Sequence, residues 1–171
     1  MSLAPLPALA VTLTVQALAA FSLAVPSVLA PAVATDFGMQ AQHVGWLVSI
    51  AYFAAMMGGL TCGTLSRRYG PVRMSQVALL AGAISMALFA FANPWVLLFA
   101  AMLLGVGYGV PNPTAADILS RHAPVARRGL FFSIKQTGVP LGVALTGLLM
   151  PMLLALMHWK SAVILMAGVL L

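Results

Sequence analysis

The chain has 171 residues, of which 63% are hydrophobic and only 6% are charged, whereas roughly 25% of the residues of a soluble domain carry charge. This composition excludes an ordinary soluble domain and indicates an integral membrane protein. The net charge of +6 would suggest nucleic-acid binding in a soluble protein. Here the basic residues flank apolar segments and mark membrane topology, so we expect the lipid bilayer and no nucleic acid as a partner.

The first residues, MSLAPLPALA, contain no basic side chain and lead into an apolar run of nearly thirty residues. Such a run is too long for a cleaved signal peptide and indicates a first membrane helix. Further apolar runs follow, each long enough to cross ~30 Å of hydrocarbon as a helix. The expected spans cover roughly residues 8–34, 44–65, 74–92, 95–119 and 129–157.

A sixth apolar segment begins at residue 161 and continues for eleven residues to Leu171, which is about 16 Å of helix and half a span. We therefore expect a fragment or an early-terminated product. The expected fold class is all-α: a polytopic membrane helical bundle with five full spans and a truncated sixth.

Basic side chains are concentrated in two of the expected loops, at residues 66–73 and 120–128. These loops hold six of the eight Lys and Arg residues, namely Arg67, Arg68, Arg73, Arg121, Arg127 and Arg128. The positive-inside rule then predicts that both loops and the N-terminus are cytoplasmic, in a bacterial inner membrane.

Small and polar residues recur at spacings of three and four within the spans, which predicts tight packing of helices. The sets are Ser49, Tyr52, Met56, Gly59 and Gly63 in span two, Gly105, Gly109 and Asn112 in span four, and Gly138, Gly142 and Thr146 in span five. Prolines inside spans are expected to bend them. Pro-Asn-Pro at 111–113 is the sharpest expected break.

The stretch GTLSRRYGPVR at 63–73 resembles the loop signature of the major facilitator superfamily, which it matches at Gly63, Leu65, Arg68 and Gly70. Glycines suit a chain that reverses within a few residues, because they can adopt positive φ. Arg67 stands where the family has Asp, so the charge network of that Asp does not carry over to this chain. Arg73 follows as a further basic residue of the loop.

A second resemblance lies in RRGLFFSIKQTGVPLG at 127–142, which is similar to the bend-and-packing region of the family's fifth helix through Gly138, Pro140 and Gly142. Together the two stretches imply the N-terminal six-helix half of a twelve-helix transporter. The resemblance also implies a missing C-terminal six-helix half as a partner, with alternating access between the two halves.

Lys135 lies about 10 Å along the helix from Arg128, where an ionisable side chain is a functional candidate. Three interpretations remain open for it: a pair with Asp117 that gates the protein, contact with an anionic substrate, and snorkelling to the headgroups. Asp117 has an alternative of its own, a network with Arg68 or Arg73 that latches the basic loop.

Other polar side chains in the spans are candidates for substrate binding, with interhelical hydrogen bonding as the alternative for each. They are Gln16, Asn112, Tyr108 and Gln136, in addition to Lys135. The resemblance favours Gln16 and Asn112, because spans one and four line the family's cavity. Asp36 and His43, in the first outer loop, are expected to cap or solvate a helix end.

The function that these features favour is secondary active transport of a small solute by alternating access, with an organic anion suggested by Lys135. The alternative is a truncated, inactive or partner-dependent bundle subunit without transport of its own. An enzyme is disfavoured, because no nucleophile–base or paired-acid arrangement is evident. The single Cys62 and the absence of Cys/His ligand spacing predict no metal site and no cofactor.

Overall fold

A computed structural model describes residues 5–38, 42–91 and 93–171 of the chain. Within these ranges the chain is helical and has no strand, as expected for an all-α membrane bundle. The helices are α1 (Pro5–Phe37), α2 (Gln42–Tyr69), α3 (Pro71–Phe89), α4 (Pro94–Gly109), α5 (Pro111–His122), α6 (Arg128–Gln136), α7 (Gly138–Leu156) and α8 (Trp159–Val169), with a 3₁₀ turn at Val125–Arg127.

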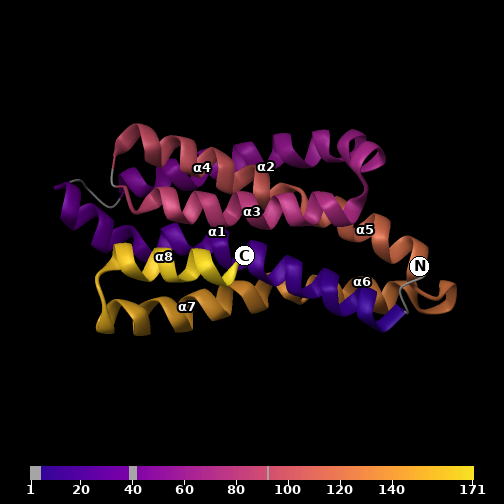
Figure 1. The fold of residues 1–171 in the computed structure, drawn as a ribbon. Coiled ribbons are helices and arrows are strands. Elements are labelled where there is room, and N and C mark those ends of the chain that lie inside the picture. The colour runs from indigo at the N-terminus through magenta and orange to yellow at the C-terminus, as the bar shows by residue number, and fades with distance from the viewer. Residues whose placement is uncertain (1–4, 39–41, 92) are drawn as a thin grey trace.

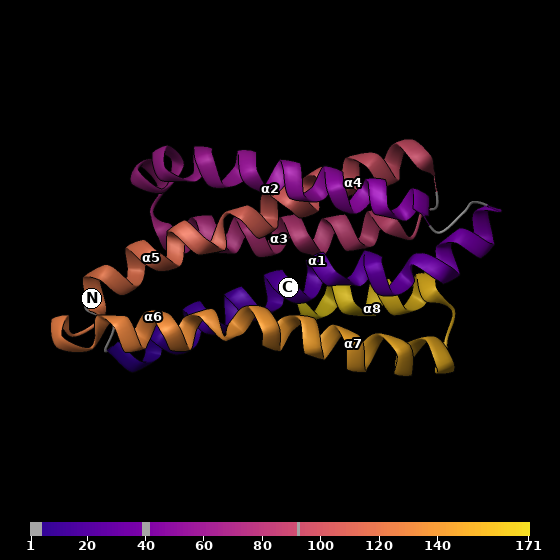
Figure 2. The same cartoon turned by 180° about the vertical axis from the view of Figure 1, so that it is seen from behind.

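The described residues form five helical stretches that are long and apolar enough to cross a membrane. The fourth stretch, Pro94–His122, joins α4 and α5, and the fifth, Val125–Leu156, joins the 3₁₀ turn, α6 and α7. The shorter apolar helix α8 follows them. In Figures 1 and 2, α2, α3 and α4 form one group, α7 and α8 lie on the other side, and α1 runs between the two.

The first basic loop is much shorter than the sequence predicted. Helix α2 continues to Tyr69 and α3 begins at Pro71, so the turn consists of Gly70 alone. Gly70 adopts φ +85° and its N–H donates to the carbonyl oxygen of Ser66 at 2.9 Å. The positive φ expected of a turn glycine is therefore found at Gly70, whereas Gly63 lies inside α2. The expected loop was too long because polar side chains at a helix end do not require the helix to stop.

Spans four and five are each divided into two helices close to a proline. Span four is interrupted at Val110, directly before Pro111, and span five at Thr137, three residues before Pro140. Proline has no N–H to donate to the carbonyl four residues earlier, so the helical hydrogen-bond ladder is locally broken. The Thr137 N–H instead donates to Ile134 O, three residues back, at 3.1 Å. The break expected at Pro-Asn-Pro is thus present.

Glycines bring two pairs of helices into close contact, as their spacing predicted. A side chain at Gly105 or Gly109 of α4 would overlap the carbonyl of Ala51 or Ala55 in α2. In the same way a side chain at Gly142 would overlap the carbonyl of Ala17 in α1.

The polar member of the span-five set completes the contact between α1 and α7. The Thr146 hydroxyl donates to Phe21 O at 3.0 Å. Small residues therefore let the helix backbones approach within contact distance, which is the usual basis of association in a membrane.

The packing face expected for span two was wrong. Ser49, Tyr52, Met56 and Gly63 are exposed, and only Gly59 of that set is half-buried. The buried face of α2 consists instead of Ala51, Ala54, Ala55, Gly58 and Cys62. Alanine and cysteine are nearly as small as glycine, so residue size did not distinguish the two faces.

The α2–α3 turn, the end of α5 and the start of α6 lie at the same end of the bundle, where α1 begins (Figure 1). This end carries the six arginines, and Lys160 lies at the opposite end, in the first turn of α8. The asymmetry that the sequence predicted along the membrane normal is therefore a property of the folded bundle.

Candidate functional site

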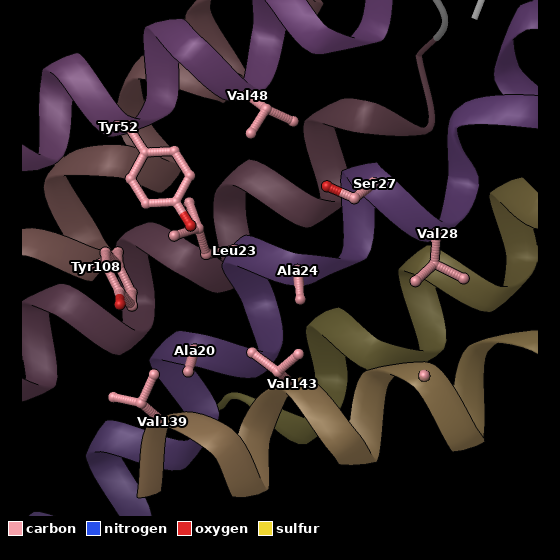
Figure 3. Close-up of a pocket in the computed structure, with 11 residues that line it drawn as sticks. Ala20, Leu23, Ala24, Ser27, Val28, Val48, Tyr52, Tyr108, Val139 and Val143 are labelled. Atoms are coloured by element: carbon pink, nitrogen blue, oxygen red, sulfur yellow. The ribbon is translucent and has the colours of Figure 1, made fainter. Parts of the chain in front are cut away.

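A cavity of about 330 Å³ lies between α1, α2, α4 and α7. Its lining, drawn in Figure 3, is mainly aliphatic and comprises Ala20, Leu23, Ala24, Ser27, Val28, Val48, Tyr52, Tyr108, Val139, Val143 and Gly147. The polar side-chain groups in this lining are the hydroxyls of Ser27, Tyr52 and Tyr108. The cavity suits a mainly apolar solute that has a small number of polar groups.

The two tyrosines form an aromatic corner of this cavity. The ring centroids of Tyr52 and Tyr108 are 6.3 Å apart and their planes meet at 81°, an edge-to-face arrangement. This geometry is favourable for aromatic rings. A flat ring could pack beside the pair. Tyr108, a candidate binding residue from the sequence, thus lines a cavity.

Lys135 and Asn112, two of the expected binding residues, contact one another. The Lys135 side chain is 4% exposed, and its Nζ donates to Oδ1 of Asn112 at 2.5 Å. Each lies one helical turn from a cavity-lining residue, Lys135 from Val139 on span five and Asn112 from Tyr108 on span four. The pair therefore occupies a layer next to the cavity, on the side of the arginine end.

Gln16 lies in the same layer on α1, one turn before the lining residue Ala20. It is fully buried, and neither Oε1 nor Nε2 has a hydrogen-bond partner. Its Cβ is packed against Gly138, where an added Cβ would lie 3.1 Å away. A buried amide group without a partner costs about 1–3 kcal/mol, so Gln16 holds unused hydrogen-bonding capacity beside the cavity.

Gln136 does not join this group. It is exposed, whereas Phe131 and Lys135 form the buried face of α6. A one-residue step along a helix turns a side chain by about 100°, which is enough to separate Gln136 from Lys135. Gln136, a candidate binding residue from the sequence, thus lies apart from the contact between Lys135 and Asn112.

Asp117 has neither of the partners considered for it from the sequence. Its carboxylate accepts two hydrogen bonds from Arg121, from Nε at 2.8 Å and from Nη2 at 2.9 Å. Residues four apart lie on the same helix face, so Arg121 is the nearest cation available. The Asp117 pair with Lys135 and the latch with Arg68 or Arg73 were thus wrong for this conformation.

The contact with Asn112 also differs from the snorkelling alternative for Lys135, in which the ammonium would reach the headgroups.

The arginines in the resembled signature lie apart from the cavity layer. Arg67 and Arg73 are exposed, and the Arg68 guanidinium lies 5.3 Å from the centre of the Tyr69 ring. None of the three bonds to an acid among the described residues.

A second polar contact lies at the opposite end of the bundle. Asp36, in the last turn of α1, accepts a 2.6 Å hydrogen bond from Nε1 of the buried Trp159, and Nε2 of His158 lies 3.5 Å from the same oxygen. Asp36 therefore ties α1 to α8 instead of capping or solvating a helix end. The His43 side chain lies outside the described residues.

Sequence reasoning missed two residues, Trp159 and Ser27. Nothing in the sequence marks Trp159 as a partner of Asp36, because more than a hundred residues separate them. Ser27 could have been found, because it continues the spacing of Ala20 and Ala24 on α1. In the described ranges, no group of three or more His, Cys, Asp or Glu side chains could hold a metal ion.

A family profile described as the Major Facilitator Superfamily matches residues 12–171. Similar curated proteins include a gallate transporter of Pseudomonas putida, 30% identical over 149 residues and covering 86% of this chain and 33% of the relative. The 4-hydroxybenzoate transporter PcaK of Pseudomonas aeruginosa is 30% identical over 142 residues, 80% of this chain and 31% of the relative.

A probable 4-methylmuconolactone transporter of Cupriavidus pinatubonensis is 31% identical over 151 residues, 85% of this chain and 35% of the relative. The chain thus spans about a third of the length of the curated relatives it matches. These relatives are transporters, which agrees with the expectation that the chain is not an enzyme.

Proposed function

This chain belongs to the major facilitator superfamily, and from that premise we propose that it takes part in secondary transport of small organic anions by alternating access. The transported anions would carry a carboxylate on an aromatic or similarly flat body. The relatives named for gallate and for 4-hydroxybenzoate support this substrate class, since both compounds are aromatic carboxylates.

The observation that carries the proposal is the charge of Lys135. The chain has only two acidic side chains, Asp36 and Asp117. Asp36 is bonded to Trp159 and Asp117 to Arg121. The buried ammonium of Lys135 is bonded to Asn112, a neutral amide. A buried cation is stable only when it is compensated, so an anion from outside this chain would be attracted to this layer.

The cavity would bind the rest of such a solute. Its aliphatic walls and the Tyr52–Tyr108 corner would shield part of a ring from water. Lys135 and Gln16, in the adjacent layer, would supply a charge-assisted hydrogen bond and a neutral one to the carboxylate. Lys135 would exchange its bond to Asn112 for one to the substrate. In this proposal Tyr108 and Gln16 would contact the substrate, as expected from the sequence, while Asn112 would hold Lys135 until the substrate binds.

Alternating access would require spans four and five to bend, and both are divided next to this layer, at Val110 and Thr137. Broken helices near the middle of the membrane are a recurring feature of transporter binding sites. We propose that the exposed face of α2, which includes Tyr52 and Met56, contacts a second six-helix half.

We propose that the protein lies in a bacterial inner membrane with its arginine end and N-terminus in the cytoplasm. The support is the placement of six arginines at one end of the bundle, since Lys and Arg are enriched on the cytoplasmic side of membrane proteins.

Uptake of radiolabelled 4-hydroxybenzoate by cells that express the intact gene tests this proposal. Lys135→Met keeps the length of the side chain but removes its charge, and we expect it to reduce uptake at least tenfold. Lys160→Met, at the opposite end, is the matched control and should transport normally. Absence of uptake by the wild-type protein would favour the alternative, a partner-dependent or inactive bundle subunit. Equal uptake by both variants would refute a role for Lys135.

A further inference from the structure

Ser27 provides a hydroxyl at the end of the cavity that lies away from Lys135. It is on α1, seven residues beyond Ala20, which corresponds to about 10 Å along the helix axis. Ala20 lies next to the Gln16 layer, and Ser27 lies beside Val28. Figure 3 shows the Ser27 hydroxyl directed toward the side of the cavity on which Tyr52 and Tyr108 lie.

The Ser27 hydroxyl is not used to stabilise its own helix. Several other hydroxyl side chains of the bundle donate to the carbonyl one turn earlier, as Ser22 does to Leu18 and Ser49 to Gly45. Ser27 donates no hydrogen bond to any residue in the described ranges, and it is exposed to the cavity. Its donor and acceptor capacity is therefore available to a solute.

The cavity is consequently apolar through its middle, with the Ser27 hydroxyl at one end and a polar layer one helical turn beyond the other end. Lys135, Asn112 and Gln16 lie next to one end and Ser27 at the other, while Leu23, Val143 and the tyrosine pair form the middle. Ala20 and Ser27 lie about 10 Å apart along α1, at 1.5 Å per helical residue, and this length accommodates one benzene ring with a substituent at either side. Gln16 lies about 16 Å from Ser27 on the same scale, so a carboxylate at the Ala20 end is bound when the Lys135 side chain leaves Asn112 and extends toward the cavity. This arrangement fits a ring that has a carboxylate at one end and a second polar group at the other.

We propose that Ser27 determines specificity, because its hydroxyl binds a ring hydroxyl located opposite the carboxylate of the substrate. A hydroxyl that enters an apolar cavity loses its bonds to water, and this loss is costly unless a partner replaces them. Ser27 supplies that partner and so favours a hydroxylated aromatic carboxylate over the unsubstituted compound. The inference rests on the proposed function, since it concerns the same cavity.

Competition experiments with 4-hydroxybenzoate and benzoate test this inference in cells that express the intact gene. The wild-type protein should prefer 4-hydroxybenzoate, and Ser27→Ala should reduce that preference about fivefold, as expected for one lost hydrogen bond. Ser27→Thr keeps the hydroxyl and should retain most of the preference. Ser49→Ala, on α2 outside the cavity lining, is the control and should match the wild type.

The outcomes separate the inference from the proposed function. Uptake of both compounds with an unchanged preference in Ser27→Ala would overturn the role of Ser27 and leave the proposed function standing. Uptake of neither compound by the wild-type protein would overturn the proposed function and this inference with it. Because Ser27 donates no hydrogen bond to any residue that the structure describes, Ser27→Ala should fold normally, which thermal unfolding in detergent can verify.

Discussion

Nζ of Lys135 donates a 2.5 Å hydrogen bond to Oδ1 of Asn112, and this contact joins the two membrane spans that are each divided near a proline. Lys135 lies in the last turn of α6, two residues before the break at Thr137, and Asn112 lies in the first turn of α5, two residues after the break at Val110. A movement that separates spans four and five must therefore break this bond, whereas a movement of both spans together can keep it. The same bond holds the cation beside the cavity.

Removal of the Asn112 amide should destabilise the protein, because it leaves the buried ammonium of Lys135 without its hydrogen-bond acceptor. We expect Asn112→Leu to cost about 1.5–3 kcal/mol of unfolding free energy, the range for hydrogen bonds to charged groups. Thermal unfolding in detergent measures this cost. The double variant with Lys135→Met should recover most of the loss, because neither partner then remains unsatisfied. Equal destabilisation in the single and double variants would contradict the assigned bond.

The contact between α2 and α4 should depend on the absence of a side chain at Gly105. Gly105→Ala places a methyl group against the Ala51 carbonyl and should cost about 1–3 kcal/mol through overpacking. Gly63→Ala is the matched control, since no atom lies within 4 Å of the added Cβ. That control should be neutral or stabilise α2 by about 0.5–1 kcal/mol through helix propensity. Equal melting temperatures for the two variants would show that α2 and α4 are not in close contact.

The turn between α2 and α3 should require glycine at position 70. Gly70→Ala leaves ample space, since no atom lies within 4 Å of the added Cβ, but the residue would have to keep φ +85°. The strain should cost about 1–3 kcal/mol, because φ +85° with ψ +148° is a backbone region that essentially only glycine adopts. Unfolding measurements on Gly70→Ala and Gly70→Asn check this, and both variants should lose stability, because Asn tolerates positive φ mainly in the left-handed helical region. A Gly70→Ala variant as stable as the wild type would contradict the strain.

The pair between Asp117 and Arg121 should contribute little to stability. It connects residues four apart on one helix, and Arg121 is largely exposed. Such pairs contribute about 0.3–0.5 kcal/mol. Asp117→Asn should therefore leave the melting temperature nearly unchanged. A large loss of uptake without loss of stability would instead indicate that Asp117 acquires another partner in a second conformation.

Features set by local chemistry along one helix could be predicted from the sequence. Hydropathy located the spans, proline chemistry located the break at Val110, and the spacing of Gly138, Gly142 and Thr146 identified the face that packs on α1. Each of these depends on residues within a few turns of one another.

Features that depend on the rotation of one helix against another could not be predicted. Lys135 had Asp117, an anionic substrate and the headgroups as expected partners, and only the relative position of α5 and α6 selects Asn112. The packing face of α2 was missed because Ala51 and Ala55 are as suitable for close contact as Gly59 and Gly63. The bond between Asp36 and Trp159 depends on where α8 returns along α1.

The central claim is that Lys135 recognises the negative charge of the substrate, and a comparison of two ligands that differ mainly in that charge tests it most directly. Binding of 4-hydroxybenzoate and of its neutral amide would be measured with the purified product of the intact gene, for the wild type and for Lys135→Met. We expect the wild type to prefer the carboxylate at least tenfold and Lys135→Met to bind both compounds with similar, weak affinity. A preference for the carboxylate that survives in Lys135→Met would contradict the claim.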